Sequence, residues 1–251
     1  MTVCSHRFHD CPHPGYVRCV NCGSYKSCVA PPPEEVYTAL YWTHERGHST
    51  LAEQVWNCED KEAHPDGLIS KNDFILRLID VEDRSAALEI GCAPGALLGR
   101  LRRDAVFGYV RGIDPCMEWS RDVDENFEGI EVCPSYFPPF DRCEETRYSL
   151  VVSCDTFEHS HRPWPFLQEC ARLLKPNGQL ILMLPIIREG YEMPERMWHP
   201  TEHVWLHSES NLRALLEQAG FDLVVIDQWC PGHDTVSARF VGAPVNQLRA
   251  A

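Results

Sequence analysis

Cysteine and histidine side chains are concentrated at the beginning of this 251-residue chain, where five of its thirteen cysteines lie within the first 28 residues. Cys19 and Cys22 have the Cys-x-x-Cys spacing at which two thiolates reach one metal ion, and Gly23 relieves crowding in the turn that follows. Cys4 and His6 offer the second pair that a tetrahedral ion needs. The sequence therefore predicts a structural zinc site formed by Cys4, His6, Cys19 and Cys22.

The choice of the first ligand pair has alternatives. The proposed set resembles the Cys-x-His and Cys-x-x-Cys-Gly pattern of small zinc ribbons. Four further side chains lie close enough to replace one member of the first pair, namely His9, Cys11, His13 and Cys28. Four protein ligands would close the ion to substrate, so its role would be structural. A reactive tail that binds no metal is the competing interpretation.

A second group of residues, Glu89-Ile90-Gly91-Cys92-Ala93-Pro94-Gly95, follows a short apolar run. Gly91 allows a sharp turn, Gly95 allows a helix start to lie close to a ligand, and the small Ala93 keeps the backbone accessible. Asp114 ends the next predicted strand, where an acid can accept hydrogen bonds from both ribose hydroxyls of an adenosine-containing ligand. The Gly-x-Gly-x-x-Gly fingerprint of dinucleotide-binding proteins is absent from this loop.

Strands and helices alternate along the segments that must position these residues. The predicted strands cover residues 86–90, 110–113, 130–132, 148–153 and 179–184, with 221–227 and 236–241 as a final pair. This order predicts an α/β fold with a Rossmann-like, mostly parallel sheet flanked by helices, preceded by the small zinc-binding segment. The predicted divisions are 1–30 for the zinc segment, 34–69 for a helical lid and 70–245 for the main domain.

The main domain resembles the class I, Rossmann-like S-adenosylmethionine-dependent methyltransferases, in particular their small-molecule branch. The family's acidic-x-Gly-x-Gly-x-Gly pattern appears as Glu89, Gly91, Ala93 and Gly95, with alanine at the middle glycine. The resemblance covers about residues 70–241. It continues through residues 148–159, 171–178, 202–205 and 215–221.

This resemblance implies S-adenosylmethionine as the cofactor, beside the predicted zinc. It implies that Gly91 and Gly95 frame the methionine portion, that Asp114 holds the ribose, and that Pro115 or Met117 packs on the adenine. The full set of implied cofactor-binding residues is Glu89, Gly91, Cys92, Ala93, Gly95, Asp114, Pro115, Met117 and Asp155.

Methyl transfer is an in-line displacement, so the protein must position the acceptor and, for a hydroxyl or carbon acid, remove a proton. The candidate catalytic residues are His203, Asp155 and His159. Asp155 follows a strand at the edge where ligands bind in open α/β sheets, and in the family this neighbourhood faces the transferring methyl. His203 resembles a family position near the substrate pocket. The Glu-His pair containing His159 is common across unrelated substrates, which favours a structural role.

The formal net charge of -14 argues against a nucleic-acid partner, because nucleic-acid binding depends on Lys and Arg. No run approaches the ~18 apolar residues of a membrane span, and no secretory signal core is present, so we expect a cytoplasmic monomer or homodimer. The leading hypothesis is methyl transfer to a hydroxyl, amine or carbon of a small metabolite, such as a sugar or natural-product intermediate. Alternatives are a protein or nucleic-acid methyltransferase that recognises its target through the zinc segment, and a non-catalytic binding module.

Overall fold

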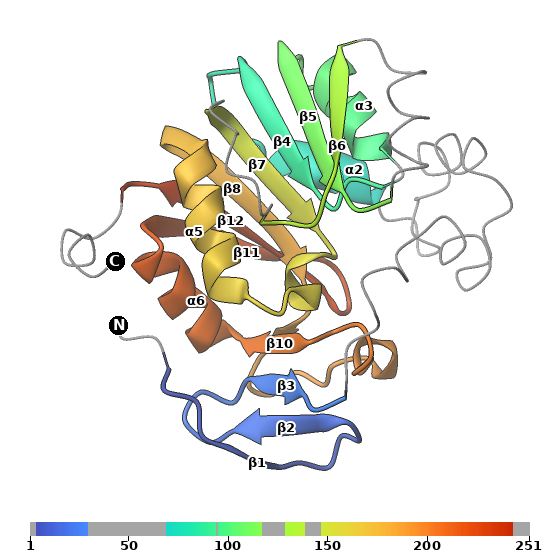
Figure 1. The fold of residues 1–251 in the computed structure, drawn as a ribbon, viewed down its shortest axis with the longest axis vertical. Coiled ribbons are helices and arrows are strands. Elements are labelled where there is room, and N and C mark those ends of the chain that lie inside the picture. The colour runs from blue at the N-terminus through green and yellow to red at the C-terminus, as the bar shows by residue number, and fades with distance from the viewer. Residues whose placement is uncertain (1–3, 30–68, 94, 117–128, 139–146, 243–251) are drawn as a thin grey trace, which may run out of the picture. The chain divides into compact units, whose positions relative to one another are not determined.

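The computed structural model describes residues 4–29, 69–93, 95–116, 129–138 and 147–242 (Figure 1). The chain forms two compact units. The ribbon unit consists of Met1–Pro32, Asp155–Arg172 and Leu182–Ala251, and the loop unit consists of Pro33–Cys154 and Leu173–Ile181. The predicted lid over residues 34–69 lies outside the described residues except for its last position, and the predicted domain boundaries stay a prediction.

The loop unit contains a parallel sheet. Its strands are β4 (Ala86–Ile90), β5 (Tyr109–Asp114), β6 (Ile130–Pro134) and β7 (Tyr148–Cys154), together with the first part of β8 (Leu174–Leu184). The order of neighbouring strands is β8-β7-β4-β5-β6. Strand β4 pairs in parallel with both β5 and β7, and β5 pairs in parallel with β6. The carboxyl ends of these strands therefore meet at one edge of the sheet.

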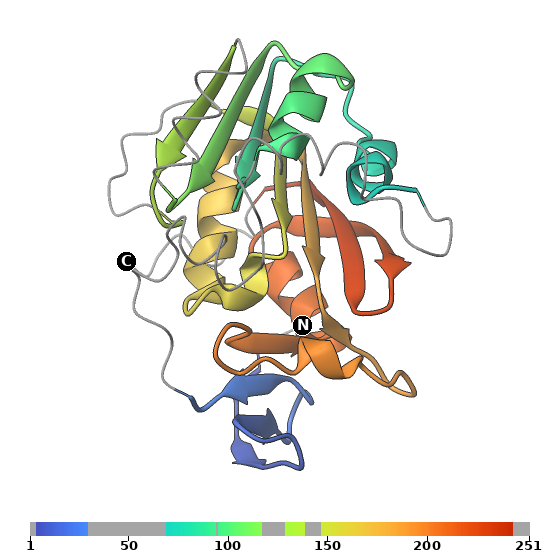
Figure 2. The same cartoon turned by 90° about the vertical axis from the view of Figure 1, so that its right-hand side faces the viewer.

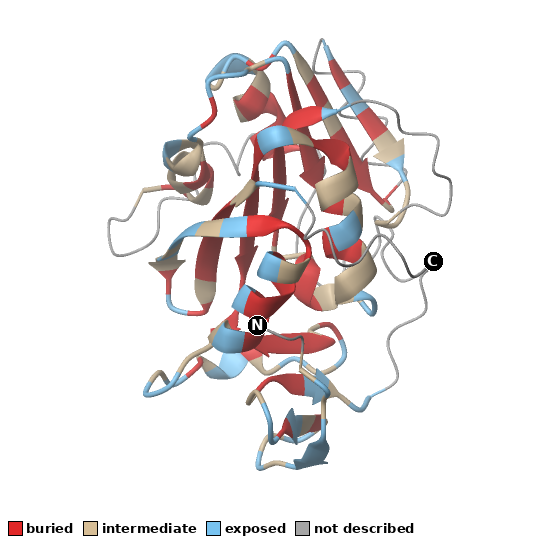
Figure 3. Ribbon diagram, turned by 90° about the vertical axis from the view of Figure 1, so that its left-hand side faces the viewer, coloured by how far each residue is buried: buried red, intermediate tan, exposed pale blue. Residues whose placement is uncertain are grey.

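Helices and apolar side chains cover this sheet. Strands β4 and β7 are buried along their whole length (Figure 3), as expected for parallel strands with no solvated face. Helix α3 (Ala96–Arg103) packs on β4, β5 and β6 (Figure 2). Its buried side chains include Leu97, Leu98 and Leu101. Helix α2 (Lys71–Leu78) is capped at its start by Ser70, whose hydroxyl accepts a hydrogen bond from the Asp73 backbone N–H at 3.0 Å.

The ribbon unit contains a second sheet, of strand order β1-β2-β3-β10-β9 (Figure 1). The N-terminal segment supplies β1 (Phe8–Asp10), β2 (Tyr16–Cys19) and β3 (Tyr25–Ser27), while β9 (Ile186–Ile187) and β10 (Trp205–Ser208) come from the second half of the chain. Strand β3 pairs antiparallel with β10, with Trp205 opposite Lys26. The N-terminal ribbon, formed by β1, β2 and β3, thus extends a sheet whose other strands are β9 and β10 of the same unit.

The remaining elements of the ribbon unit are helices and a long hairpin. They are η3 (Phe157–His159), α5 (Pro163–Leu173), η4 (Glu195–Met197), α6 (Glu209–Gln218), β11 (Phe221–Cys230) and β12 (His233–Phe240). The hairpin continues the strand order as β11-β12-β8. Ser208 caps α6, since its hydroxyl accepts a hydrogen bond from the Asn211 N–H.

The structure confirms the predicted fold class, a Rossmann-like α/β fold with a mostly parallel sheet flanked by helices. The strand predicted over residues 179–184 begins earlier in the structure, because residues 174–178 also belong to β8. Asn177 adopts a φ of 62°, so the strand accommodates the bend that its Pro-Asn-Gly sequence favours without ending there. Among the described residues, none of the helices has both the length and the apolar character of a membrane span.

Candidate functional site

The glycine loop joins β4 to α3 in the loop unit. Gly91 and Gly95 have φ values of 74° and 93°, a left-handed backbone conformation that favours glycine. The Gly91 N–H donates to the Ile113 carbonyl at 2.8 Å, and the Gly95 N–H donates to the Cys92 carbonyl at 2.6 Å. The loop is therefore held against the end of β5 and opens directly into the first turn of α3.

Asp114, the last residue of β5, is joined to this loop by its carboxylate. One oxygen accepts from the Ala93 N–H at 3.1 Å and the other accepts from the Cys116 N–H at 2.9 Å. Burial raises the pKa of Asp114 to about 6, although these two N–H donors act in the opposite direction. Each carboxylate oxygen has a second lone pair that these N–H donors do not use. The carboxylate can therefore still accept hydrogen bonds from two neighbouring hydroxyl groups.

The other predicted cofactor residues in the loop unit differ in their surroundings. Glu89 is buried within β4, and Pro115 is half-buried after β5. Cys92 is buried, and a Cβ atom added to Gly112 would come within 2.5 Å of its sulfur. Burial raises the pKa of the Cys92 thiol, which makes it a neutral packing group rather than a nucleophile. Met117 lies outside the described residues.

Asp155 belongs to the ribbon unit and follows directly after β7. Its φ of 49° is one that residues other than glycine rarely adopt, and its backbone N–H donates to the Met183 carbonyl at 2.9 Å. Its carboxylate lies 3.1 Å from Nδ1 of His233. Nothing in the local sequence relates His233 to a residue 78 positions earlier, so the sequence alone does not indicate this contact.

The structure brings His159 and His203 together. One ligand atom from each, with one from Glu158, lies within 4.8 Å of the others, and the two imidazole rings are 5.2 Å apart. The His203 ring contacts the Met197 carbonyl through Nδ1 at 2.8 Å, and burial lowers its pKa. Glu158 is buried, and its carboxylate lies 3.9 Å from His159.

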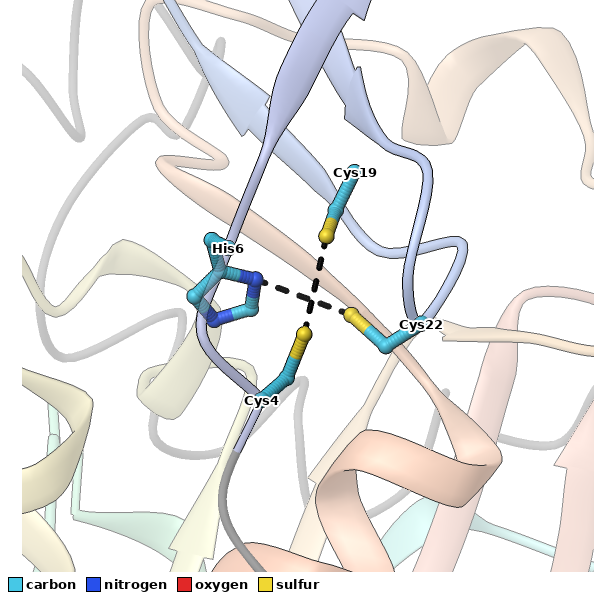
Figure 4. Close-up of side chains that lie close together, drawn as sticks. All are labelled: Cys4, His6, Cys19 and Cys22. Atoms are coloured by element: carbon cyan, nitrogen blue, oxygen red, sulfur yellow. Dashed lines mark hydrogen bonds between the residues drawn. The ribbon is translucent and has the colours of Figure 1, made fainter.

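The four predicted metal ligands also lie together, in the ribbon unit (Figure 4). The Cys4 and Cys19 sulfurs are 3.6 Å apart, and the Cys22 sulfur is 3.6 Å from Nδ1 of His6. Two thiolates on one tetrahedral zinc ion, with Zn–S bonds of ~2.3 Å, would be about 3.8 Å apart. All four ligand atoms fall within 4.8 Å of one another, so small side-chain movements bring them onto one ion.

The alternative ligands have other surroundings. The Cys11 thiol points at the carbonyls of His13 and Tyr16, and Cys28 is exposed. The His13 ring stacks on Trp198 with 3.4 Å between ring centres. The geometry thus favours the first predicted set over these replacements.

A family model described as a methyltransferase domain matches residues 67–226. A tRNA U34 carboxymethyltransferase of Idiomarina loihiensis is 31% identical over 171 residues, which are 60% of this chain and 48% of that protein. A protein of the same name from Pseudoalteromonas translucida is 29% identical over 173 residues, which are 62% and 50% of the two chains. The chain spans about half the length of the curated relatives that it matches.

Two solved structures share the fold. One is a chain from a complex between the Haloferax volcanii Trm112 methyltransferase activator and a methyltransferase, with a TM-score of 0.62 and 17% identity, over 76% of this chain and 95% of that one. The other is the 1,6-didemethyltoxoflavin-N1-methyltransferase of Burkholderia thailandensis, solved with S-adenosylhomocysteine, with a TM-score of 0.58 and 17% identity over 89% of this chain and 98% of that one.

Proposed function

The chain belongs to the methyltransferase-domain family, and from that premise we propose that it transfers a methyl group from S-adenosylmethionine to an acceptor. The observation that carries this proposal is the bonding of the Asp114 carboxylate to the Ala93 N–H in the glycine loop. Because this bond ties the ribose-binding acid to the loop, the two parts of an adenosine-binding site are held in one arrangement before any ligand arrives.

The residues of the loop unit fit S-adenosylmethionine. The left-handed Gly91 and Gly95 place no Cβ over the loop, and Asp114 offers two carboxylate oxygens that can accept from ribose hydroxyls. Alanine at position 93 is compatible with this role, because its contribution here is a backbone N–H. When bound, the cofactor supplies an activated methyl group. The protein supplies orientation, exclusion of water and a place for the acceptor's proton.

We expect the affinity for S-adenosylmethionine to depend on pH through Asp114. Burial raises the pKa of this carboxyl to about 6 in the folded protein. Ribose hydroxyls bond better to the ionised form, so affinity should rise with pH through about 6 and fall below it. Calorimetric titration with S-adenosylmethionine between about pH 5 and pH 8, a range that brackets this pKa, measures the affinity of each form. An Asp114→Asn variant should lose the dependence, and an equal slope in that variant would contradict the assignment.

A nucleic acid, specifically tRNA, is the acceptor class that the relatives favour. Three curated relatives are named tRNA U34 carboxymethyltransferases. The expectation that the acidic chain avoids nucleic acid therefore loses its support. Total charge does not describe a local surface: residues 4–29 contain exposed Arg7, Arg18 and Lys26 against the single acid Asp10.

A small metabolite is the second candidate. The human mitochondrial ubiquinone biosynthesis O-methyltransferase is 32% identical over 112 residues, which are 38% of this chain and 27% of that protein. The net charge of -14 also agrees with a small acceptor better than with a polyanion. In this case a hydroxyl oxygen would receive the methyl group, and Asp155, His159 and His203 are proposed to line the acceptor side.

The acceptor class can be tested with the full chain and S-adenosylmethionine carrying a tritiated methyl group. With unfractionated bacterial tRNA, we expect label that precipitates with RNA and is released by ribonuclease. Mass spectrometry of the digested nucleosides then identifies the methylated nucleoside, since S-adenosylmethionine alone supplies a methyl group. Label appearing only with a bacterial metabolite extract would support the second candidate. The Asp114→Ala variant serves as the negative control. If neither the tRNA reaction nor the metabolite reaction gives labelled product, both candidate acceptor classes are contradicted.

We further propose that Cys4, His6, Cys19 and Cys22 bind a structural zinc ion. The ribbon they close is hydrogen-bonded to the segment that carries His203. The Tyr16 hydroxyl donates to the His203 carbonyl at 3.0 Å, the Ser27 hydroxyl donates to the Pro200 carbonyl at 2.6 Å, and the Ser27 N–H donates to the Val204 carbonyl at 2.9 Å. The metal would therefore support the acceptor-side segment, in addition to any recognition of a target by the ribbon.

A further inference from the structure

Three potential metal ligands lie together in the ribbon unit, in addition to the four at the N-terminus. They are Glu158 and His159 of η3, and His203, which lies between η4 and β10. One ligand atom of each residue lies within 4.8 Å of the others. Nε2 of His159 lies 3.9 Å from Oε1 of Glu158. All three residues belong to one compact unit, so the fold of that unit alone brings them together.

The hydrogen bond at one nitrogen of His203 prepares the ring to bind a metal through the other. Nδ1 of His203 lies 2.8 Å from the Met197 carbonyl oxygen. A carbonyl only accepts, so Nδ1 carries a proton and donates it, which leaves Nε2 as the nitrogen that offers a lone pair. Histidines that bind metals almost always donate their second ring N–H to a carbonyl, a carboxylate or water, and this bond fixes the orientation of the ring.

The charges near these residues suit a cation. Glu158 is buried, and buried charges in proteins are paired, hydrogen-bonded or coordinated to metals. The carboxylates of Asp155 and Glu202 lie close enough to act electrostatically on His203. Carboxylates of three acidic residues therefore lie near the two imidazoles, and a divalent ion among them would offset their mutual repulsion.

We propose that Glu158, His159 and His203 bind a divalent first-row transition-metal ion, such as Mn²⁺ or Fe²⁺. Two imidazoles and one carboxylate form a donor set that leaves coordination positions open for water or for an oxygen of a bound molecule. Ligand atoms on one ion with bonds of ~2.1 Å would be about 3.4 Å apart. The side chain of His159 is 23% exposed, so it has room to rotate and shorten the separations that the structure shows.

The donor sets of the two clusters allow their metals to be told apart. Three thiolates and one imidazole favour a soft or borderline ion such as zinc, whereas carboxylate and imidazole ligands also accept the harder Mn²⁺. In a chain already saturated with zinc, added Mn²⁺ should therefore report the second cluster alone. The inference does not depend on the proposed methyl transfer, because binding is measured without cofactor or acceptor.

The test titrates the zinc-saturated full chain with Mn²⁺ and follows the electron paramagnetic resonance signal of the free ion. We expect one bound Mn²⁺ per chain, with the zinc retained. Electron spin-echo modulation of the bound ion should show directly coordinated nitrogen from two imidazoles, a signature that carboxylates at the surface cannot give. No binding of Mn²⁺ or Co²⁺ beyond the zinc already present would overturn the proposal.

Substitution of the ligands identifies the site. His203→Ala and His159→Ala should each lower Mn²⁺ affinity by more than the roughly 10- to 100-fold that loss of a supporting hydrogen bond costs. Any ion that remains should show nitrogen from one imidazole. Glu158→Gln keeps the size of a buried side chain and removes its charge, so its affinity should also fall. His161→Ala, at an exposed histidine two residues beyond η3, is the matched control and should bind Mn²⁺ normally.

A folding defect can be separated from the loss of a ligand. The Tyr16 hydroxyl donates to the backbone carbonyl of His203, so His203→Ala keeps this contact with the ribbon. Circular dichroism and the zinc content of each variant should match those of the unmodified chain. His159 is partly exposed, so His159→Ala provides the test if a more buried position fails to fold. Mn²⁺ binding of unchanged affinity and nitrogen modulation in both folded histidine variants would overturn the proposal.

Discussion

Asp114→Ala is expected to lower the affinity for S-adenosylmethionine about 100-fold, equivalent to ~3 kcal/mol. The variant removes the carboxylate proposed to accept two ribose hydroxyls, and each hydrogen bond to a charged group contributes about 1.5–3 kcal/mol. It also leaves the Ala93 and Cys116 N–H groups without the acceptor that holds the loop. Isothermal titration of the full chain with S-adenosylmethionine and with S-adenosylhomocysteine measures both effects together.

Two further variants separate charge from shape at this position. Asp114→Asn keeps the size of the side chain and one acceptor oxygen, so its affinity should lie between those of the unmodified chain and the alanine variant. Asp104→Ala removes an exposed acid from the same unit, at the end of α3, and should bind normally. Tight binding by a folded Asp114→Ala chain would contradict the cofactor site. It would leave the alternative of a module that binds a partner through its N-terminal ribbon.

Removal of the zinc ion proposed for the N-terminal site is expected to produce the other large effect. Three strands of three or four residues bury too little surface to stay folded alone, and a structural zinc ion typically contributes about 10–16 kcal/mol to such a segment. Without it, the contacts from Tyr16 and Ser27 to the His203 segment should be lost. We expect methyl transfer to fall at least about 10-fold, because misplacement of about 1 Å costs up to 10²-fold.

The same treatment should change cofactor affinity little, by about twofold or less, since the glycine loop and Asp114 belong to the other unit. Cys19→Ser should reproduce the effect of chelation, and Cys28→Ser, an exposed cysteine of the same segment, is its matched control. Elemental analysis should find one zinc per chain in the unmodified protein and in Cys28→Ser. Full activity in chain shown to be metal-free would contradict a supporting role for the ion.

Short-range sequence features were sufficient to predict the elements of the loop unit. A buried apolar run, a glycine turn, a helix with an apolar stripe and an acid at the end of the next strand are each encoded within a few residues. Parallel strands that are buried on both faces then require helices around them, so the fold class followed from the order of these elements. The zinc ligands could be proposed for the same reason, because Cys-x-x-Cys spacing is itself a short-range geometric constraint.

Tertiary structure alone decided which distant segments meet. Strand β3 could pair with many exposed edges, and only the folded chain shows that it joins β10, with Lys26 opposite Trp205. The same holds for His233, whose partner Asp155 lies 78 residues earlier. A single sequence records the periodicity and local preference of each strand, but the register and partner of a strand depend on packing between segments distant in the chain. The glycine loop and the acid after the next strand were therefore predictable from sequence, whereas the contact between Asp155 and His233 was not.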